Sequence, residues 1–388
     1  MIFIRKIKVL EVISDTNVGG AGRLLISRIE NSNRQKFEYT VILPKGSLIA
    51  EPLKKAGAKV IEINACKDKS RDLKNIFAFY KIIKNVSPDI VNSHACLTSR
   101  ISAKMAGVSV NLFTRHCDFK VRKIYSVPAV KFAVKMFNSG FNDGAIAVSH
   151  SAKNNLLSLG VPKKMIKVIV NGAQALKQIS EDEKQRIRQS LKIPFDATVV
   201  SIFARLEAYK DHKTLLRAAK LLKLNRKIYF LIVGCGTLER ELKQYARKLG
   251  LDIGLDKKVR FLGFVDDVST IMNITDINVN CSIGTETSSL ALSEGMSLGV
   301  PAIASDYSGN KYIVKNGVNG LTFPQKDHVA LAQKILILSK NKALYKKLSL
   351  NAKERFHKEL NAKRMTRETE KYYLSILDMC KFKKQIRR

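Results

Sequence analysis

The sequence lacks three features that would each assign it to a particular class of protein. Its six cysteines are scattered and form no C-x-x-C pair, which argues against a disulfide framework or a zinc ribbon and favours a reduced, cytosolic protein. No stretch approaches about 18 uncharged apolar residues, so no membrane-spanning helix is predicted. The opening MIFIRKIKVLEVIS has no small-residue cleavage site after it and predicts a β-strand rather than a signal peptide.

Acidic residues are also scarce. There are 33 Asp and Glu against 69 Lys and Arg, a net charge of +36, and such a surface attracts nucleic acid, anionic lipid or phosphorylated substrates. The excess is even, with 29 basic and 11 acidic residues in 1–173 and 40 and 22 in the remainder. Because no RNP motif, zinc finger or heptad zipper is present, no specific nucleic acid partner is expected. An anionic membrane surface and a merely lysine-rich composition both remain open.

The chain does contain a regular alternation of β-branched runs and helical stretches, which predicts parallel sheets covered by helices on both faces, an α/β fold of two Rossmann-like domains. The predicted strands are Lys6–Ile13, Tyr39–Leu43, Lys59–Ile63, Ile90–Ser93, Val110–Thr114, Gly144–Val148, Ile166–Val170, Thr198–Ala204, Tyr229–Val233, Val259–Phe261, Ile277–Asn280 and Pro301–Ala304.

Four segments are predicted along the chain. Residues 1–173 form the first domain, and 174–197 form a linker in which Ser180 and Glu183 make a capping box at a helix start. Residues 198–360 form the second domain. A basic helix over 361–388 is expected to pack back on the first domain.

A glycine-rich segment, Gly19-Gly20-Ala21-Gly22-Arg23, follows the first predicted strand and opens a helix. Glycines let the backbone approach a ligand closely, and the N–H groups at a helix start suit a phosphate or a sugar hydroxyl. The segment is not the G-x-G-x-x-G of dinucleotide-binding proteins. A ligand-binding turn and a plain tight turn therefore both remain open.

Two features of the second half lie where a phosphate site is expected. Gly234-Cys235-Gly236 follows a predicted strand, but Glu239 stands in place of the third glycine of a dinucleotide fingerprint, so NAD binding is rejected. Arg205 and Lys210 follow the strand Thr198–Ala204. Two cations at the carboxyl end of a strand can clamp a diphosphate, and a solvated surface is the alternative.

The strongest motif is the pair Glu286 and Glu294, spaced E-x7-E within GTETSSLALSEGMSLGVPAIAS. Serines near an N-cap predict a helix over Ser288–Leu298, with Glu286 before it and Glu294 about two turns inside it. In such an arrangement one carboxylate would lie near a reacting sugar and the other would bond ribose hydroxyls, while the N–H groups between them could hold phosphate. Two surface glutamates are the alternative.

Together these motifs resemble the retaining glycosyltransferases of family 4, the group 1 class with the GT-B fold. The resemblance covers nearly the whole chain and is tightest over 198–324, which holds SIFARLEAYKDHKTLLRAA, FLIVGCGTLERELKQYA and the E-x7-E block. In the first half GGAGR, TRH at 114–116 and VSHSAKNNLLSLGVPKKMIKVIVNGA fit the same pattern. It implies two Rossmann-like doubly wound parallel-sheet domains facing a central cleft.

The resemblance also implies roles for individual residues. Arg205 and Lys210 would neutralise the donor diphosphate, Glu294 would bind the ribose, and Glu286 would lie near the donor sugar. His116 would face that sugar across the cleft, whereas His94 and His150 are more simply structural. The remaining implied donor contacts are Gly19, Gly20, Gly234, Ser288, Ser289 and Leu290.

The implied reaction is hexosyl transfer from a nucleotide-diphosphate sugar, UDP-sugar above all, with retention by front-face substitution. No D-x-D occurs, so no metal is expected, nor a separate cofactor. The implied acceptor is a saccharide or lipid-linked saccharide in cell-surface polysaccharide or lipopolysaccharide synthesis. The expected location is cytoplasmic, with peripheral attachment at the inner face of the membrane. The basic, apolar segment Phe119–Asn138 is either a membrane-contact helix or a core helix with snorkelling lysines.

The sequence departs from the family pattern at four points. Thr287 stands where a glycine is common, Ser288-Ser289 replaces a Ser/Thr-then-Asn pair, and Tyr312 replaces a glutamate. The alanine usual before the second glutamate is also replaced, giving Ser293-Glu294-Gly295. These changes leave the donor sugar open. The alternatives are a non-catalytic GT-B-like protein, a relative resembling nucleotide-sugar epimerases, or a basic protein that binds nucleic acid or an anionic surface.

Overall fold

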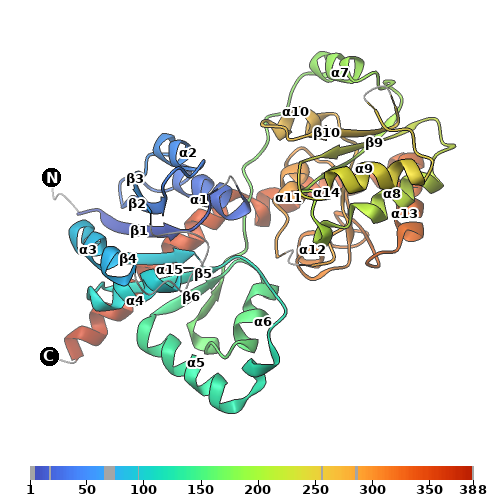
Figure 1. Cartoon of the computed structure of the whole chain (residues 1–388). Coiled ribbons are helices and arrows are strands. Elements are labelled where there is room, and N and C mark those ends of the chain that lie inside the picture. The colour runs from blue at the N-terminus through green and yellow to red at the C-terminus, as the bar shows by residue number, and fades with distance from the viewer. Residues whose placement is uncertain are drawn as a thin grey trace. The chain divides into compact units, whose positions relative to one another are not determined.

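The chain forms two compact units in the computed structural model, which describes residues 5–16, 19–64, 75–94, 96–254, 257–284 and 287–386 (Figure 1). The first unit comprises Met1–Gly172 and Ala362–Arg388, and the second comprises Ala173–Asn361. The segment 174–197, expected as a linker, therefore belongs to the second unit, and the C-terminal helix belongs to the first.

The first unit is built on a seven-stranded parallel sheet in the order β3-β2-β1-β4-β5-β6-β7. Its strands are β1 (Ile7–Ile13), β2 (Phe37–Pro44), β3 (Lys59–Ile63), β4 (Ile90–His94), β5 (Val110–Arg115), β6 (Gly144–Ala147) and β7 (Ile166–Val168). Its α-helices are α1 (Gly20–Glu30), α2 (Ala50–Lys55), α3 (Ile76–Val86), α4 (Leu97–Met105), α5 (Pro128–Phe141), α6 (His150–Ser158) and α15 (Ala362–Ile386).

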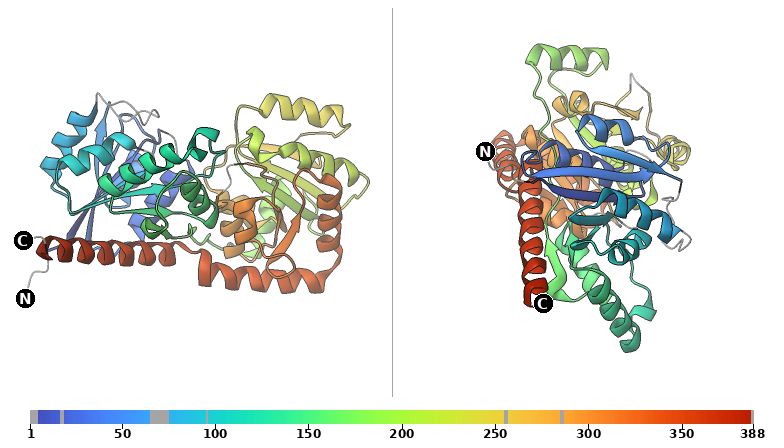
Figure 2. Two further views of the ribbon diagram at one scale, coloured as in Figure 1. Left: turned by 90° about the horizontal axis from the view of Figure 1, so that it is seen from below. Right: turned by 90° about the vertical axis from the view of Figure 1, so that its left-hand side faces the viewer.

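Side-chain alternation along β1 decides what each face of this sheet buries. Leu10 and Val12 pack with Phe79 and Ile83 of α3, so the intervening Glu11 points to the opposite face. The long helix α15 runs along the first unit (Figure 2) and contacts α1 and β5. The Oε1 atom of Glu370 on α15 accepts hydrogen bonds from Ser32 Oγ at 2.6 Å and from the Asn33 amide at 2.9 Å.

The second unit repeats the plan with a six-stranded parallel sheet in the order β10-β9-β8-β11-β12-β13. Its strands are β8 (Thr198–Phe203), β9 (Ile228–Val233), β10 (Val259–Gly263), β11 (Ile277–Asn280), β12 (Ala302–Ser305) and β13 (Gly320–Phe323). Its α-helices are α7 (Glu181–Ser190), α8 (His212–Leu221), α9 (Glu239–Lys248), α10 (Val268–Asn273), α11 (Leu290–Ser297), α12 (Ser308–Ile313), α13 (His328–Lys340) and α14 (Lys342–Arg355).

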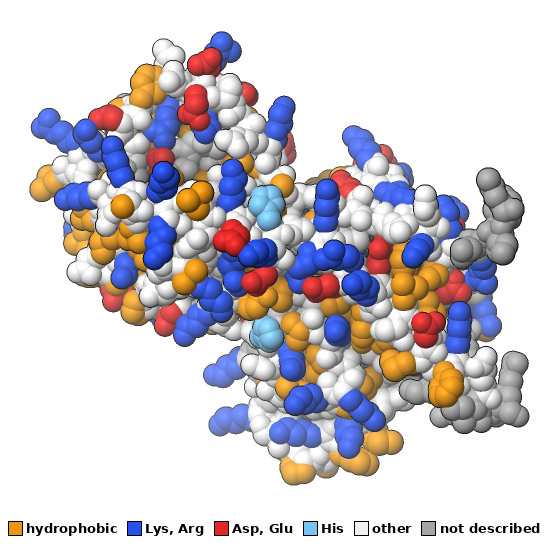
Figure 3. Space-filling model, turned by 180° about the vertical axis from the view of Figure 1, so that it is seen from behind, with side chains coloured by type: hydrophobic (Ala, Val, Ile, Leu, Met, Phe, Trp, Pro, Cys, Tyr) orange, Lys and Arg blue, Asp and Glu red, His pale blue; other side chains and the backbone are white. Residues whose placement is uncertain are grey.

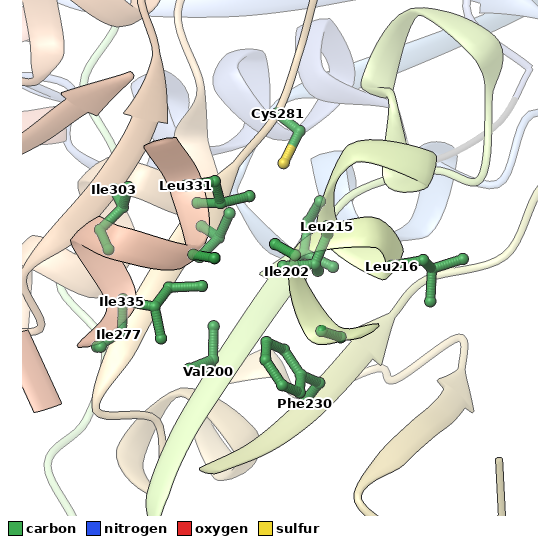
Figure 4. Close-up of a cluster of buried hydrophobic side chains, with 14 of the residues drawn as sticks. Val200, Ile202, Leu215, Leu216, Phe230, Ile277, Cys281, Ile303, Leu331 and Ile335 are labelled. Carbon is green, nitrogen blue, oxygen red and sulfur yellow. The ribbon is translucent and has the colours of Figure 1, made fainter. Parts of the chain in front are cut away.

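The core of the second unit is an apolar cluster contributed by both the sheet and its covering helices. Val200 and Ile202 of β8 pack against Leu215 of α8 and Ile335 of α13, all fully buried (Figure 4). The segment before β8 is tied to the same unit, because Arg188 of α7 forms a 2.9 Å ion pair with Asp276. Removing such apolar surface from water is the main stabilising contribution to each unit.

The predicted α/β fold of two Rossmann-like domains is confirmed. Every predicted strand is present with its ends within two residues of the prediction, and β13 is a strand that the prediction lacked. In each sheet the chain order reverses at the centre, between β1 and β4 and between β8 and β11. The carboxyl ends of strands at such a switch point are where doubly wound sheets bind ligands.

Candidate active site at the carboxyl edges of the sheets

The loop after β8 brings Arg205 and Lys210 to one aromatic ring. The Arg205 guanidinium lies 5.9 Å, and Lys210 Nζ 5.5 Å, from the centroid of the Tyr209 ring. Arg205 also donates a hydrogen bond to the Tyr209 hydroxyl. The Arg205 side chain is exposed and forms no ion pair with any part of the chain that the structure describes.

The glycines of Gly234-Cys235-Gly236 hold this loop in place. Gly234 has a φ of +135°, and a Cβ there would lie 2.1 Å from the carbonyl oxygen of Ala204. A Cβ on Gly236 would lie 2.6 Å from the backbone of Leu206, whose amide donates to the Cys235 carbonyl at 2.9 Å. The turn after β9 therefore packs directly against the backbone on both sides of Arg205, which only glycine permits.

The loop after β11 reaches the same edge and leads into α11. The Ile283 amide donates to the Tyr209 carbonyl at 2.9 Å, which joins this loop to the one that carries Arg205 and Lys210. Ser289 caps α11, because its Oγ accepts from the Leu292 amide at 3.4 Å and from Asn280 Nδ2 at 3.1 Å. Ser288 Oγ is buried and has no hydrogen-bond partner among the described residues.

Of the two glutamates in the E-x7-E motif, only Glu294 lies within the described residues. Glu294 lies in α11 with 4% of its surface exposed. The next residue, Gly295, lets α11 pack tightly on β11, since a Cβ there would lie 2.7 Å from Asn278 Nδ2. Glu286, predicted near the donor sugar, lies outside the described residues. The predicted contact residue Leu290 is the first residue of α11.

Tyr312, which replaces the glutamate of the family pattern, contacts the end of α14. Its hydroxyl donates to Glu359 Oε2 at 3.4 Å, and the Arg355 guanidinium lies 5.4 Å from its ring centroid. Arg355 also donates to the Tyr312 carbonyl at 2.6 Å. The substitution therefore contributes contacts that hold α12 against the C-terminal part of this unit.

The carboxyl edge of the first unit carries a buried charged network centred on Glu11 of β1. Arg28 of α1 forms an ion pair with Glu11 Oε1. The Tyr373 hydroxyl of α15 donates to the same oxygen at 3.0 Å. Asn92 Nδ2 donates to Glu11 Oε2 at 2.9 Å. Glu11 is 0% exposed and Arg28 is 6% exposed, so each charge depends on the other inside the core.

This network continues through two histidines at the ends of β4 and β5. His94 Nε2 lies 2.8 Å from Glu11 Oε2, and His94 Nδ1 lies 2.6 Å from His116 Nε2. The two rings are stacked with centroids 4.9 Å apart. The structure thus places the predicted His116 beside His94, which the sequence presents only as a structural residue.

Burial and neighbouring charges shift the pKa values of two groups in this network. Burial raises the pKa of Glu11, but the Arg28 charge and the His94 hydrogen bond outweigh it and lower that pKa to about 2. Burial, followed by the neighbouring His94, lowers the pKa of His116 well below its usual value. Glu11 is therefore ionised and His116 is neutral near pH 7.

A cavity of about 30 Å³ lies against these histidines within the first unit. That volume holds about one or two water molecules. Besides apolar side chains, it is lined by the polar residues Arg28, His94, Thr114, His116, Asn171 and Thr369.

The glycine-rich segment before α1 has room around two of its glycines. Gly19 is the N-cap, with a φ of −85°, and a Cβ on Gly20 would meet no atom within 4 Å. The close contact falls on Gly22, where a Cβ would lie 3.0 Å from Ile49. Backbone packing therefore does not explain why glycine occupies positions 19 and 20, and approach of a ligand to Gly19 and Gly20 remains a prediction.

His150, which the sequence presents as a structural residue, is exposed as the first residue of α6.

Sequence reasoning missed five members of these sites: Glu11, Arg28, Asn92, Tyr209 and Tyr373. One signal was present, because Glu11 is a charged residue in the otherwise apolar run Val9–Ile13, and such a residue is buried only with a partner. Among the described residues no cluster of His, Cys, Asp or Glu forms a metal site, and no described helix is long and apolar enough to cross a membrane.

Two family models match the chain. The model for glycosyl transferases group 1 matches residues 183–355, and the model for glycosyltransferase family 4 matches residues 18–175. The chain belongs to the group 1 glycosyltransferases. The resemblance stated from its motifs is confirmed, and the group 1 glycosyltransferase has the GT-B fold that the resemblance implied.

Relatives and solved structures extend over most of this group 1 glycosyltransferase. It is 27% identical to an Escherichia coli UDP-Gal:alpha-D-GlcNAc-diphosphoundecaprenol alpha-1,3-galactosyltransferase, over 87% of this chain and 89% of the relative. It is 25% identical, over 90% and 93%, to a Campylobacter jejuni alpha-1,4-N-acetyl-D-galactosaminyltransferase named for an undecaprenol-diphosphate-linked saccharide. Anabaena Alr3699/HepE, solved with UDP and glucose, superposes with a TM-score of 0.81 at 21% identity over 95% and 100% of the chains.

Proposed function

We propose that this glycosyltransferase moves a hexosyl group from a UDP-sugar to a lipid-linked saccharide in the synthesis of cell-surface polysaccharide or lipopolysaccharide, with retention of configuration. The observation that carries the proposal is the meeting of two loops at the carboxyl edge of the second unit. One presents Arg205 and Lys210 around Tyr209, and the other opens α11. Fixed positive potential at a switch point suits a diphosphate.

In this proposal, different residues at this edge bind different parts of the donor. Arg205 and Lys210 stabilise the charge on the departing diphosphate, and the buried Ser288 hydroxyl donates a hydrogen bond to its oxygens. Glu294 binds the ribose hydroxyls, and Glu286 lies near the donor sugar. The proposal includes no metal and no separate cofactor.

Retention follows from front-face substitution in this proposal. The bond from the anomeric carbon to the diphosphate oxygen breaks with its electron pair on that oxygen, through an oxocarbenium-like state. The acceptor oxygen bonds to the anomeric carbon on the same face, and its proton passes to the departing diphosphate. The names of both relatives give α-linked products, which a retaining transfer forms from an α-linked donor.

A thermal-shift series tests the donor site. UDP is expected to raise the melting temperature while GDP, ADP, CMP and NAD do not, because a ligand that binds only the folded state stabilises by about 2.7 kcal/mol at 100 times its Kd. EDTA should leave the UDP shift unchanged. Arg205→Ala should abolish the shift without lowering the melting temperature of the free protein. A protein that melts cooperatively and responds to none of these nucleotides would contradict the proposed donor site.

A second observation favours contact of the first unit with a membrane that carries the acceptor. Arg100 donates to Asn138 Oδ1 at 2.7 Å and stacks on Phe137, which fixes the inward face of α5. The opposite face exposes Phe132 by 62% and Met136 by 55%. Basic residues flank this surface or lie on it: Lys120, Arg122, Lys123, Lys131 and Lys135. Apolar side chains ringed by lysine suit an anionic interface.

The general positive charge does not explain such contact by itself. On the face that Figure 3 shows, lysine and arginine side chains lie over both units with acidic side chains between them. Exposed large apolar side chains also occur on other helices, among them Phe77 of α3 and Phe382 of α15. The proposed contact therefore rests on Phe132 and Met136 sharing one face of α5, one turn apart.

Vesicle co-sedimentation tests this contact. The protein should bind phosphatidylglycerol vesicles more tightly than phosphatidylcholine vesicles, and salt should weaken the binding. Exchanging Phe132 and Met136 for serine should reduce binding about tenfold or more. Leu224→Ser is the matched control, since Leu224 is 93% exposed in the second unit. Equal binding by the two variants would contradict a role for α5.

A further inference from the structure

A cluster of polar side chains is buried where β11 and β12 end, next to the residue that caps α11. Its five members are each at most 6% exposed: Asn280, Ser282, Ser289, Ser305 and Asn310. Burying polar groups is unfavourable unless they form hydrogen bonds with one another. Apolar side chains would avoid this penalty, whereas a bonded polar cluster fixes one particular arrangement of the segments that contribute to it.

The directions of the hydrogen bonds in this cluster follow from one backbone contact. The Ser282 amide donates to Asn280 Oδ1 at 2.9 Å, so the other end of the Asn280 side chain is a donor. Asn280 Nδ2 accordingly donates to Ser289 Oγ at 3.1 Å. Asn310 Nδ2 donates to Asn280 Oδ1 at 3.2 Å and to Ser305 Oγ at 3.0 Å. Turning over either amide would place two donors or two acceptors against each other, so both orientations are determined.

These hydrogen bonds connect separate elements of the second unit. Asn280 ends β11, Ser289 is the N-cap of α11, and Asn310 lies in α12. The connection continues into the first turn of α11, where the Leu292 amide donates to Ser289 Oγ at 3.4 Å. A second branch runs from Ser305 Oγ to a backbone carbonyl of the loop after β11 at 2.5 Å. The start of α11 is therefore linked through side chains to α12.

We propose that Asn280, Ser289 and Asn310 form an amide clasp that fixes the start of α11 for the donor diphosphate, and that Asn310 is a positioning residue of the donor site. This rests on the proposed function, in which the start of α11 and the Ser288 hydroxyl bind the diphosphate. Ser288 directly precedes the N-cap to which the clasp is bonded. Donor groups bind a phosphate tightly only if they are held in place before it arrives.

The cations of the site are held by other contacts. Arg205 and Lys210 lie around Tyr209, whose carbonyl accepts from the Ile283 amide. Loss of the Asn310 side chain leaves these contacts in place and loosens only the α11 side of the site. Its effect on the donor should therefore be a partial loss of affinity, smaller than the complete loss expected when Arg205 is removed.

Hydrogen exchange followed by mass spectrometry tests the clasp in the protein without ligand. Asn310→Ala should speed exchange in the first turn of α11, although residue 310 lies in α12. Thr275→Ala is the matched control. Thr275 is buried just before β11, where its hydroxyl contacts Ser201 Oγ at 2.8 Å and the Ile271 carbonyl at 2.7 Å. That variant also loses buried hydrogen bonds of the second unit, so equal exchange of α11 in the two variants would overturn the clasp.

Ser289→Gly breaks the clasp at its other end and keeps the test decisive if Asn310→Ala does not fold. Glycine is well tolerated as an N-cap residue, so α11 itself should lose little stability. The amides of residues 306–310 should nevertheless exchange faster, because the segment after β12 loses its link to α11. Unchanged exchange over these residues in Ser289→Gly would overturn the clasp.

Calorimetric titration with UDP tests the role of the clasp at the donor site. Asn310→Ala should weaken UDP binding about tenfold, the order expected when one well-placed hydrogen bond is lost. Thr275→Ala should leave the affinity unchanged. When Ser289→Gly is already present, adding Asn310→Ala should weaken binding no further, since residues of one network are not additive. Equal losses in Asn310→Ala and Thr275→Ala, or additive losses in the double variant, would overturn the positioning role.

The two measurements separate this proposal from the proposed function. A natural protein that binds no UDP would overturn the proposed function, and with it the assignment of the clasp to a diphosphate. Hydrogen exchange would still decide whether the clasp links α12 to α11. Normal UDP binding that does not respond to Asn310→Ala would overturn the positioning role and leave the proposed function intact.

Discussion

The two units share one topology and use charge at their carboxyl edges in opposite ways. In the first unit Glu11 and Arg28 are buried and paired with each other. In the second unit Arg205 is exposed and held by Tyr209 without an ion pair to any described residue. A buried charge with a protein partner belongs to the fold, whereas an exposed charge at a switch point is available to a ligand. The same edge therefore stabilises the fold in one unit and, in the proposed function, binds the donor in the other.

Removing a cation from the second unit should break activity and spare the fold. Lys210→Ala is expected to lower kcat about 10²–10³-fold, the usual cost of losing one group that stabilises developing charge. Its melting temperature should stay unchanged. Lys213→Ala is the control, because Lys213 forms a half-exposed ion pair with Glu241 and lies over the Tyr245 ring. Steady-state kinetics and a melting curve on both variants suffice, and near-normal turnover in Lys210→Ala would remove the contrast between the units.

Removing the Glu11 carboxylate from the first unit should instead lower the stability of the fold. Glu11→Gln leaves Arg28 buried without its counter-charge and is expected to cost about 3–5 kcal/mol of unfolding free energy at pH 7. Urea denaturation measures it. Glu51→Gln, which removes an exposed partner of Lys54, should be indistinguishable from the natural protein. If both substitutions are silent, the buried pair does not stabilise the first unit.

Acidification should remove the contribution of Glu11 to the unfolding free energy. Its pKa falls from 4.5 to about 2 on folding, so its contribution is complete above pH 4.5 and is lost as the pH falls toward 2. The unfolding free energies of the natural protein and Glu11→Gln should therefore converge over that interval, by about 3 kcal/mol. Urea titrations from pH 6 to about 3 would show the trend, and parallel curves would contradict it.

Glycines at the two edges should respond differently to alanine. Gly234→Ala places a side chain against the Ala204 carbonyl at a φ of +135°, which costs about 1–3 kcal/mol and displaces the loop of Arg205. Gly20→Ala meets open space and should not lower stability. Melting curves and UDP binding distinguish the two. Equal tolerance would mean that the turn after β9 does not hold the Arg205 loop.

The smallest expected effect concerns the hydroxyl of Tyr373. Tyr373→Phe removes its contacts with Glu11, Arg28 and Asn92 and keeps the buried ring, for a loss of about 1 kcal/mol. Tyr372→Phe, at the preceding position of α15, is the comparison. A loss as large as that of Glu11→Gln would show that the ion pair depends on this hydroxyl.

The sequence predicts what depends on local pattern. Strand positions follow from short β-branched runs, and the loop with Arg205 and Lys210 is visible because both residues lie within six positions of one strand. β13 escaped prediction because it begins on Gly320, at the end of the turn-forming run Asn316–Gly320, and glycine and asparagine are depleted in strands. The Glu11 network could not be predicted, since its members come from five elements and Tyr373 lies 362 residues from Glu11. Only folding brings such residues together.

The division of the chain into units has a consequence for synthesis. The first unit is discontinuous, because it needs α15, which follows the whole of the second unit in the chain. A ribosome makes β1 early and α15 after residue 361, so the second unit can fold before the first is complete. Until α15 arrives, Glu11 and Arg28 lack the Tyr373 ring that covers them. The unit that begins first during translation is therefore the one that finishes last.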